Sequence, residues 1–416
     1  MVRVLFVNQH YWPDTASTGQ HLTDVAEHLA HEGHDVRVLC AQTMPRKQRL
    51  ATRETRNGVE IQRVSIRSAA ELPGRMRGYA GFHTAVAPRL LATRWPEVIV
   101  TLTTPPMLGL WGSLASRLRG VEHVTWLMDH HPDAEFEAGM LSRNSVVGRV
   151  LECAYRWTLA NASRNVVLGP YQGERVTRRG VDPASLATIP IWSRADEIDA
   201  APGEREALRD ELGWNGFVVL YSGNAGQVHR FDELLSAMKR LEGRPEIHFA
   251  FVGGGPRRPE IEEFVARERL TNASFHPALP RERLGALLSA ADAHFVSLRP
   301  EQVGVSVPSK LYGQLASARP VLFVGPAACE TAEDLGASLG GRTFEIGEDE
   351  ALASGIVKLA RDPETCREMG ARGRTWFLER REKNVACDLW TKLIEDVAGT
   401  GTRSAMPLLE ERACAS

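Results

Sequence analysis

The sequence predicts an α/β protein of two domains, each with a doubly wound parallel sheet that helices cover on both faces. The chain of 416 residues is roughly two to three times as long as a typical domain. It begins with a strand–loop–helix–strand pattern, and the same pattern begins again near residue 217. Strands that alternate with helical segments are typical of such parallel sheets.

The first domain is expected to begin with a buried strand, a long loop and a helix. The strand is 2–7, VRVLFV, and the helix is 20–33, where apolar residues recur at the spacing of one helical face. Gly33 provides the usual end of such a helix. Later apolar runs predict further strands at 34–41, 97–102, 122–128 and 164–169.

The second domain is expected to repeat this plan. Its first strand is 217–223, FVVLYSG, and a loop leads from it to a helix at 231–243. Later apolar runs predict further strands at 247–255, 273–279, 293–298 and 320–325.

The polar segment 193–212 predicts the domain boundary, because linkers are polar and exposed. The domains are therefore expected at 1–195 and 196–375. The helical pattern near the end of the chain predicts a helix at about 376–398 that packs back on the first domain.

Composition excludes some functions and predicts a location. The formal net charge of −2 and the pI of about 6.7 provide no global basic field for nucleic acid. The six cysteines are scattered and the N-terminus enters a strand without a signal peptide, which predicts free thiols in a cytoplasmic protein. Pro105 and Pro106 interrupt the apolar stretch 98–118, which predicts strand, turn and helix rather than a membrane span.

Candidate binding residues follow the strands, where loops of open α/β sheets meet their ligands. In the loop after 217–223, Gly223 and Gly226 allow a close backbone approach to an anion, although a tight turn would also explain them. At the start of a later helix, Ser309 and Lys310 supply a hydroxyl and an ammonium suited to a diphosphate. The alternative for this pair is a serine N-cap followed by a solvated lysine.

A polar cluster follows the strand 122–128. Asp129, His130, His131 and Asp133 suit acid–base chemistry or hydrogen bonds to sugar hydroxyls, although a structural role is open for each histidine. No metal site is expected, because the chain has no D-x-D pair and no helical histidine pair with a third ligand. Gly19, before the first helix, is a further candidate on the N-terminal side of the predicted cleft.

A basic stretch at 63–95 predicts contact with an anionic membrane, or else a solvated helix face. Its arginines and aromatic residues are Arg63, Arg67, Arg75, Arg77, Arg89, Arg94, Tyr79, Phe82 and Trp95.

Taken together, these motifs resemble family 4 of the nucleotide-sugar-dependent glycosyltransferases, in particular its bacterial exopolysaccharide and lipid-linked-saccharide members. The resemblance covers nearly the whole chain, in the order of the family. The stretches that carry it are NQHYWPDTASTGQHLTDVAEHLAHEGHDVRVL, TLTTPPMLGL, WLMDHHPD, IPIWSRADEI, VVLYSGNAGQVHRFDELL, FVGGGPRR, VPSKLYGQLASARPVLFVGP and MGARGR.

The resemblance implies a GT-B fold, in which two Rossmann-like domains face each other across a cleft. It also implies retaining transfer of a hexosyl or N-acetylhexosaminyl group from a nucleoside diphosphate sugar, with UDP favoured as the carrier and without metal or other cofactor. The acceptor would be a lipid-linked saccharide at the inner membrane surface or a soluble molecule. Open alternatives are a nucleotide-sugar epimerase of the same fold and a non-catalytic protein that binds nucleotide sugars.

The resemblance also implies roles for individual residues. The diphosphate would contact Gly19, Gly223, Asn224, Gly226, Ser309 and Lys310. Catalysis would involve Asp129, His130, His131 and Lys310. The donor's sugar or base would meet Arg230, His229, Glu301 and the backbone from Pro277 to Leu279, and the acceptor would meet His10 and Asp133.

The sequence departs from the family pattern at two points. Many members carry an E-x7-E pair, but Ser309 stands eight positions after Glu301. The lysine that often follows the glycine loop is replaced by His229, beside Arg230. Lys310 is therefore expected to carry more of the charge that opposes the diphosphate.

Overall fold

The structure, a computed structural model, describes residues 1–42, 50–66 and 74–399, and the side chains of the last range from residue 78. It divides into two compact units. The N-terminal unit holds Met1–Pro190 and the segment that begins at Ala386, and the C-terminal unit is Ile191–Val385. The expected boundaries at 195 and 375 lie a short distance along the chain from these.

The N-terminal unit is built on an eight-stranded sheet of order β3-β4-β2-β1-β5-β6-β7-β8. All neighbours pair in parallel except β3 and β4. Its elements are β1 Arg3–Val7, α1 Ser17–His31, β2 Asp35–Ala41, β3 Arg53–Arg56, β4 Val59–Val64, α2 Gly74–Ala92, β5 Val98–Thr101, α3 Gly109–Arg119, β6 Glu122–Trp126, α4 Asp133–Glu137, α5 Val146–Ala160, β7 Arg164–Val167, α6 Pro170–Thr177, η1 Pro183–Ser185, β8 Leu186–Thr188 and most of α16 Lys383–Val397.

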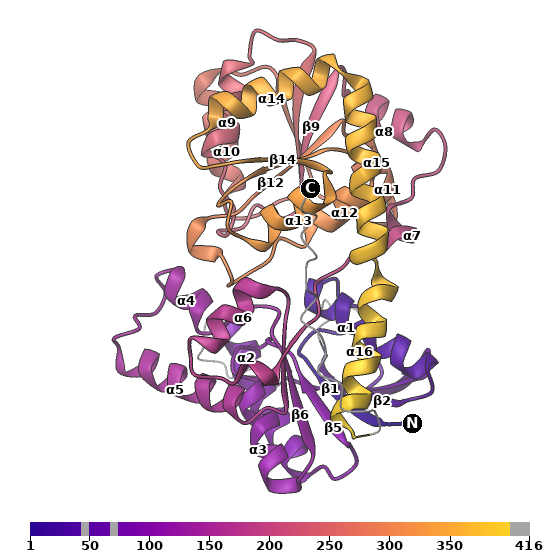
Figure 1. Cartoon of the computed structure of the whole chain (residues 1–416), viewed down its shortest axis with the longest axis vertical. Helices are drawn as coiled ribbons and strands as arrows, with labels where there is room; N and C mark the ends of the chain where they lie inside the picture. The colour runs from indigo at the N-terminus through magenta and orange to yellow at the C-terminus, as the bar shows by residue number, and fades with distance from the viewer. Residues whose placement is uncertain (43–49, 67–73, 400–416) are drawn as a thin grey trace, which may run out of the picture. The chain divides into compact units, whose positions relative to one another are not determined.

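Helices cover both faces of this sheet because successive strand residues point to opposite sides. Val7 packs in one core with Phe82 of α2, whereas the neighbouring Phe6 faces Trp390 of α16, with ring centroids 6.5 Å apart. Trp390 also packs against Trp126, at 4.4 Å. The C-terminal helix therefore returns to the first unit, as expected, and runs along its sheet (Figure 1).

The C-terminal unit is built on a six-stranded parallel sheet of order β11-β10-β9-β12-β13-β14. Its elements are α7 Ala195–Ile198, α8 Glu204–Leu212, β9 Phe217–Ser222, α9 Asp232–Arg240, β10 Ile247–Val252, α10 Arg258–Glu268, β11 Ala273–His276, η2 Arg281–Arg283, α11 Leu284–Ala290, β12 Ala293–Ser297, η3 Pro300–Gln302, α12 Lys310–Ala316, β13 Val321–Val324, α13 Glu330–Ser338, β14 Gly341–Phe344, α14 Asp349–Arg361 and α15 Pro363–Arg380.

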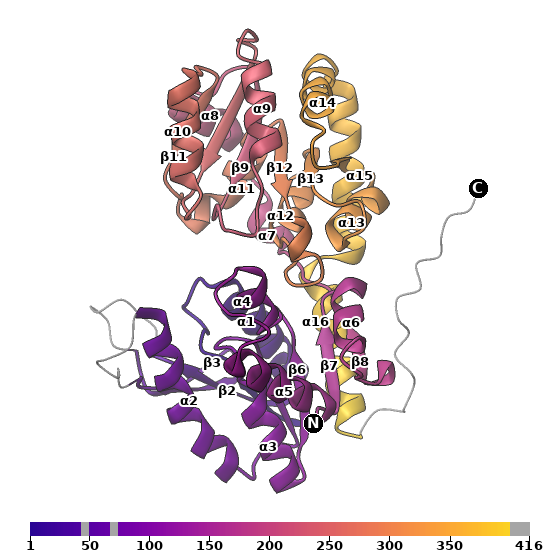
Figure 2. The same ribbon diagram turned by 90° about the vertical axis from the view of Figure 1, so that its left-hand side faces the viewer.

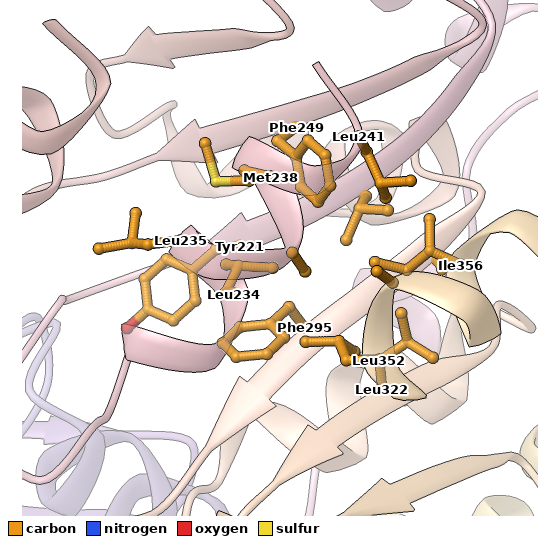
Figure 3. Packing of buried hydrophobic residues seen from close by; sticks show 14 of the residues in the cluster. Tyr221, Leu234, Leu235, Met238, Leu241, Phe249, Phe295, Leu322, Leu352 and Ile356 are labelled. Atoms are coloured by element: carbon orange, nitrogen blue, oxygen red, sulfur yellow. The ribbon is translucent and has the colours of Figure 1, made fainter. Parts of the chain in front are cut away.

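The same alternation builds two cores in this unit. Val219 and Tyr221 of β9 pack in the larger core with residues of α9, α10 and α14. Val218 and Leu220 pack with α8 and α11 on the other face. Figure 2 shows α9 and α14 in this unit, and Figure 3 shows Tyr221 at the edge of the larger core with its hydroxyl directed away from the other labelled side chains.

Each sheet has a point where the strand order reverses. In the N-terminal unit this point lies between β1 and β5, and in the C-terminal unit it lies between β9 and β12. Loops that leave the carboxyl ends of such strands diverge, and ligands of open α/β sheets bind there. The β9 and β12 loops contain Gly223 and lead to Lys310.

Two features differ from the prediction. The hairpin β3–β4 was not anticipated, although its turn is Asn57-Gly58, both with positive φ, a pair typical of tight hairpins. The C-terminal helical run is two helices, because the carbonyl of Arg381 and the amide of Lys383 pair with the backbone of Ser193 instead of continuing one helix.

The basic stretch is only partly available for membrane contact. Arg63 is buried, where it pairs with Glu54, and Phe82 is in the core, so neither can face a bilayer. The side chains of Arg67, Arg75 and Arg77 lie outside the described residues, as does Cys414. None of the helices in the described ranges is long and apolar enough to cross a membrane.

Candidate functional site

The loop after β9 exposes backbone rather than side chain. Gly223 has a φ of +110°, a conformation that glycine adopts without strain, and both Gly223 and Asn224 are exposed. The amide of Gly223 donates to Val252 and that of Gly226 donates to Asn224, so these two N–H groups are already bonded. The glycines therefore allow a ligand to approach the backbone of this loop closely.

A second glycine run supports this loop. A Cβ at Gly253 would lie 2.3 Å from the carbonyl oxygen of Gly223, and one at Gly255 would lie 2.4 Å from the amide nitrogen of Ala225. Both positions therefore need glycine so that the end of β10 can pack against the loop. The sequence signal was the run FVGGG, to which no role was assigned.

Lys310 reaches beneath this loop from the start of α12. Its Nζ donates to the hydroxyl of Tyr221 at 2.8 Å and lies 4.1 Å from the centre of the Tyr221 ring. The Nζ is also 3.7 Å from the position that a Cβ of Gly223 would take. Burial lowers the pKa of Lys310 to about 7. The half-buried side chain of Lys310 is thus held against the loop by Tyr221 instead of extending freely into solvent.

Ser309 does not cap α12. It has helical dihedral angles, and its side chain accepts no hydrogen bond from the first turn of the helix. The N-cap alternative is therefore wrong. The half-buried side chain of Ser309 stands next to Lys310 along the chain.

His229 and Arg230 are engaged within the protein. Burial lowers the pKa of His229 to about 3, so the ring is neutral, and its Nδ1 donates to the carbonyl of Ser297 at 2.7 Å. The Nε of Arg230 donates to both carboxylate oxygens of Glu233 at 2.8 Å. These contacts tie the loop to β12 and to α9.

Two arginines that sequence reasoning missed converge on the same loop. The carbonyl of His229 accepts from Arg257 at 2.7 Å and from Arg299 at 3.1 Å. Arg257 is also paired with Glu260. Within the described ranges, no carboxylate lies at ion-pair distance from Arg299, so its remaining donors are uncommitted to an acid. Arg230 and Arg257 are neutralised by their paired acids, so Lys310 and Arg299 are the cations that give this loop its positive charge.

Glu301 and Leu279 lie on neighbouring loops of the same unit. Glu301 is exposed in η3, the short helix that follows β12. Leu279 is half-buried after β11 and packs on the core of α8 and α11.

In the N-terminal unit, two predicted site residues are core residues. His130 is fully buried, its Nδ1 is 2.8 Å from the hydroxyl of Tyr155, and burial lowers its pKa to about 3. Asp133 is fully buried among Arg143, Arg175 and Arg179. Burial alone would raise the pKa of Asp133, but the arginines hold it below its usual value. Neither side chain has surface with which to contact a substrate, which corrects their assignment.

His131 and Asp129 differ from these neighbours. The Nδ1 of His131 lies 2.7 Å from the carboxylate of Glu135, a partner that sequence reasoning missed although it lies four residues away on the first turn of α4. Burial lowers the pKa of His131, but Glu135 outweighs this effect and raises it. Asp129 is half-buried, with its amide 3.4 Å from the hydroxyl of Thr103.

Gly19 and His10 are brought together. Gly19 is in the first turn of α1, and a Cβ there would lie 3.2 Å from the backbone carbon and the Cβ of His10. The Nδ1 of His10 lies 2.6 Å from Asp14, again four residues away. A glycine thus lets α1 pack closely against the loop that holds His10, where a larger side chain would be tight.

The two sites have different chemistry. The C-terminal loop can oppose negative charge on a ligand, whereas the N-terminal loops present imidazoles paired with carboxylates, which can accept or donate protons and hydrogen bonds. In the described part of the chain, no three His, Cys, Asp or Glu side chains are grouped so that they could hold a metal ion.

Comparison with known proteins defines the class. The model of the glycosyl transferase 4-like domain matches residues 18–192, and that of the glycosyl transferases group 1 matches residues 204–376. The chain therefore belongs to the family 4 glycosyltransferases, and its two parallel-sheet units form the GT-B fold.

Individual relatives agree with this class. The chain is 26% identical over 349 residues to the putative colanic acid biosynthesis glycosyl transferase WcaI of Escherichia coli K12, across 80% of this chain and 84% of WcaI. The probable glycosyltransferase WbjE of Pseudomonas aeruginosa is 26% identical over 229 residues, 55% of this chain and only 57% of WbjE. The structure of Anabaena HepE in complex with UDP has a TM-score of 0.72 at 14% identity, over 95% of this chain and 100% of that chain, which shows the fold alone.

Proposed function

We propose that this glycosyltransferase moves a hexosyl or N-acetylhexosaminyl group from a nucleoside diphosphate sugar to a lipid-linked saccharide or glycan precursor, with retention of configuration. The C-terminal unit binds the donor, and the N-terminal unit supplies the groups that meet the acceptor. UDP is the favoured carrier, and the structurally similar HepE in complex with UDP supports this choice.

The observation that carries the proposal is the position of Lys310. Its ammonium lies against a loop that exposes Gly223 and Asn224, at the point where the strand order reverses. This is the place and the charge that a diphosphate needs. With a pKa near 7, Lys310 is only partly charged until an anion arrives, and a diphosphate would hold its proton in place.

This arrangement favours the transition state over the ground state. When the bond between the sugar's anomeric carbon and the phosphate oxygen breaks, the electron pair stays on the nucleoside diphosphate. Negative charge therefore grows next to Lys310 and Arg299, whose interaction with the ligand strengthens at that moment. These cations do what a divalent ion does in other transferases, so we propose that no metal is required.

On the N-terminal unit, Asp129 and the His131–Glu135 pair are the proposed acceptor groups. Glu135 fixes the Nδ1–H of His131, which leaves Nε2 as the ring nitrogen available to a ligand. Asp129 is half-buried on the same loop. Both can hold the acceptor hydroxyl in place while the donor bond breaks.

A direct test measures release of UDP from UDP-glucose, UDP-galactose and their N-acetylhexosamine counterparts, with and without a lipid-linked saccharide acceptor and with EDTA present. We expect acceptor-dependent release that EDTA leaves unchanged, and a product whose anomeric configuration, read by NMR, matches that of the donor. An altered nucleotide sugar formed without acceptor would instead establish an epimerase. Binding of these nucleotide sugars with no turnover on any acceptor would establish a binding protein.

A further inference from the structure

Exposed apolar side chains gather on one segment of the N-terminal unit. The exposed fractions are 73% for Met140, 75% for Val146, 59% for Val147 and 60% for Val150. These residues lie within a single stretch that runs from the end of α4 into the first turns of α5. Scattered single apolar residues need no explanation, but a group of this kind marks an interaction surface.

Helix α5 displays these side chains on a fixed face. Val146, Val150 and Cys153 recur at the spacing of one helical stripe and are exposed, whereas Tyr155 and Leu159 are buried on the opposite side. The helix begins at a stable cap, because the hydroxyl of Ser145 accepts from the amide of Gly148 at 3.0 Å. The apolar face is therefore part of the packed unit.

Arginines border this stripe and line a pocket beside it. Arg149 and Arg156 lie one turn to either side of Cys153 and are exposed. A pocket of about 360 Å³ opens here, lined by Phe136, Arg143, Arg149, Glu152, Cys153 and Arg156.

The charge of this pocket is positive after its ion pairs are counted. Glu152 is paired with Arg179, and Arg143 is paired with Asp133 and Glu137. Among the described residues, Arg149 donates to the carbonyl of Asn144 and to no carboxylate.

Arg156 has no carboxylate at ion-pair distance within the described ranges. Two guanidinium groups, those of Arg149 and Arg156, therefore remain without an acidic partner among the described residues. Two phosphodiester anions, or one doubly charged anion, would neutralise both.

We propose that this surface, named here the α5 face (Met140, Val146, Val147, Arg149, Val150 and Arg156), docks on an anionic lipid bilayer. The valines and the methionine enter the interface between headgroups and acyl chains, and the two arginines bind lipid phosphates in the pocket. This deepens the proposed function, on which it rests for its biological sense, because a lipid-linked acceptor is available only to an enzyme held at the membrane.

The charges favour a bilayer over a second copy of the chain. A two-fold contact through the α5 face would place the same patch on both subunits, so Arg149 and Arg156 would meet arginines of the other copy without acids to pair them. An anionic bilayer instead supplies phosphates to these arginines and an apolar layer to the valines. The α5 face also differs from the basic stretch 63–95 named by the sequence, of which Arg63 and Phe82 are buried.

The test is co-flotation of the full-length protein with vesicles of phosphatidylcholine, alone or mixed with phosphatidylglycerol. We expect binding that requires phosphatidylglycerol. The double variants Val147→Asp/Val150→Asp and Arg149→Glu/Arg156→Glu are each expected to lower the partition coefficient by about tenfold or more. The first places carboxylates where apolar side chains enter the bilayer, and the second replaces the cations that bind lipid phosphates with anions.

Matched controls lie on α15 of the other unit. Arg367 and Arg372 are exposed, so Arg367→Glu/Arg372→Glu changes the net charge by the same amount, and Leu378→Asp places an acid at another exposed apolar position. We expect these variants to bind vesicles within twofold of wild type. Equal losses of vesicle binding in the α5-face variants and the α15 controls would overturn the proposal, as would binding that does not depend on phosphatidylglycerol.

Two further experiments test the other candidate ligands of the α5 face, which are free phosphate and a second copy of the chain. Inorganic phosphate and sodium chloride are compared at equal ionic strength, and we expect the same vesicle binding in both. Release of the protein from vesicles by phosphate but not by sodium chloride would assign the pocket to free phosphate. Sedimentation without lipid measures self-association of the protein, and we expect the α5-face variants to leave it unchanged. Self-association that these variants abolish would assign the face to a second copy of the chain. Either result overturns membrane docking.

Failure of membrane docking can be distinguished from failure of the proposed function. UDP-glucose binding, followed by the thermal unfolding midpoint, is expected to be the same in wild type and in the α5-face variants. Donor binding and turnover without vesicle binding would overturn the membrane inference alone. Vesicle binding without use of any nucleotide sugar would overturn the proposed function alone.

Discussion

The two units use the same topology to build sites of opposite chemistry. In the C-terminal unit, glycines expose the loop after β9, Lys310 lies against it, and Arg257 and Arg299 donate to its backbone. In the N-terminal unit, the loop after β6 presents a histidine paired with a carboxylate, His131 with Glu135. The loop after β9 lies at the reversal point of its sheet, whereas the loop after β6 lies one strand beyond the reversal point between β1 and β5, and the residues of each loop give it its own chemistry.

A parallel contrast concerns two tyrosines. Tyr221 bonds the ammonium of Lys310, and Tyr155 bonds the imidazole of His130. Lys310 lies against an exposed loop, whereas His130 is fully buried. Similar local pairs therefore lie beside an exposed loop in one unit and in the core of the other, and substitutions can test whether this contrast matters for the proposed donor site.

The largest effect is expected for Lys310→Ala. Loss of the cation that opposes the departing diphosphate should lower turnover of the nucleotide sugar by about 10²- to 10³-fold. Steady-state release of UDP measures this. Lys358→Ala, an exposed lysine of the same unit, is the control and should keep wild-type turnover. Full activity of Lys310→Ala would refute the donor assignment.

A smaller loss of catalytic activity is expected for substitutions in the N-terminal unit. His131→Gln and Glu135→Gln should each lower kcat by about 10- to 100-fold, because each breaks the pair that orients the imidazole toward the acceptor. The affinity for UDP-glucose, measured by calorimetry, should not change. If donor affinity fell instead of kcat, the two units would not have the separate roles proposed here.

The pH dependence of donor affinity sharpens the comparison. Because burial lowers the pKa of free Lys310 to about 7 and a diphosphate favours its protonated form, binding above pH 7 requires proton uptake. The Kd for UDP-glucose should therefore be flat below pH 7 and rise by up to about tenfold per pH unit above it. Lys310→Met should bind weakly with no such rise. A rise that persists in this variant would point to another titrating group.

The smallest effect is expected from the two tyrosines. Tyr221→Phe removes one hydrogen bond to Lys310 and should weaken UDP-glucose binding by about two- to tenfold. Tyr155→Phe removes the hydroxyl beside His130 and should leave that affinity unchanged, while lowering the free energy of unfolding by about 1 kcal/mol. Calorimetry and urea unfolding report the two quantities. Equal effects on donor binding would erase the contrast between the units.

Much of the fold could be predicted because its signals are local. Buried apolar runs and intervening helical patterns predicted the β1, β9 and β12 strands, and the returning C-terminal helix was found from its helical pattern. The hairpin at Asn57-Gly58 was missed although its turn signal was present. The break between α15 and α16 could not be predicted, because it depends on pairing with the distant Ser193.

The candidate site was only partly predictable for the same reason. The sequence by itself determined which residue types follow each strand: the glycine loop at Gly223, the pair Ser309-Lys310 and the cluster that begins at Asp129. Only the tertiary structure decided that the half-buried Lys310 bonds Tyr221, and that His130 is a core residue while His131 pairs with Glu135. The physical reason is burial: the charge and exposure of a side chain depend on elements packed against it from elsewhere in the chain, which sequence order does not reveal.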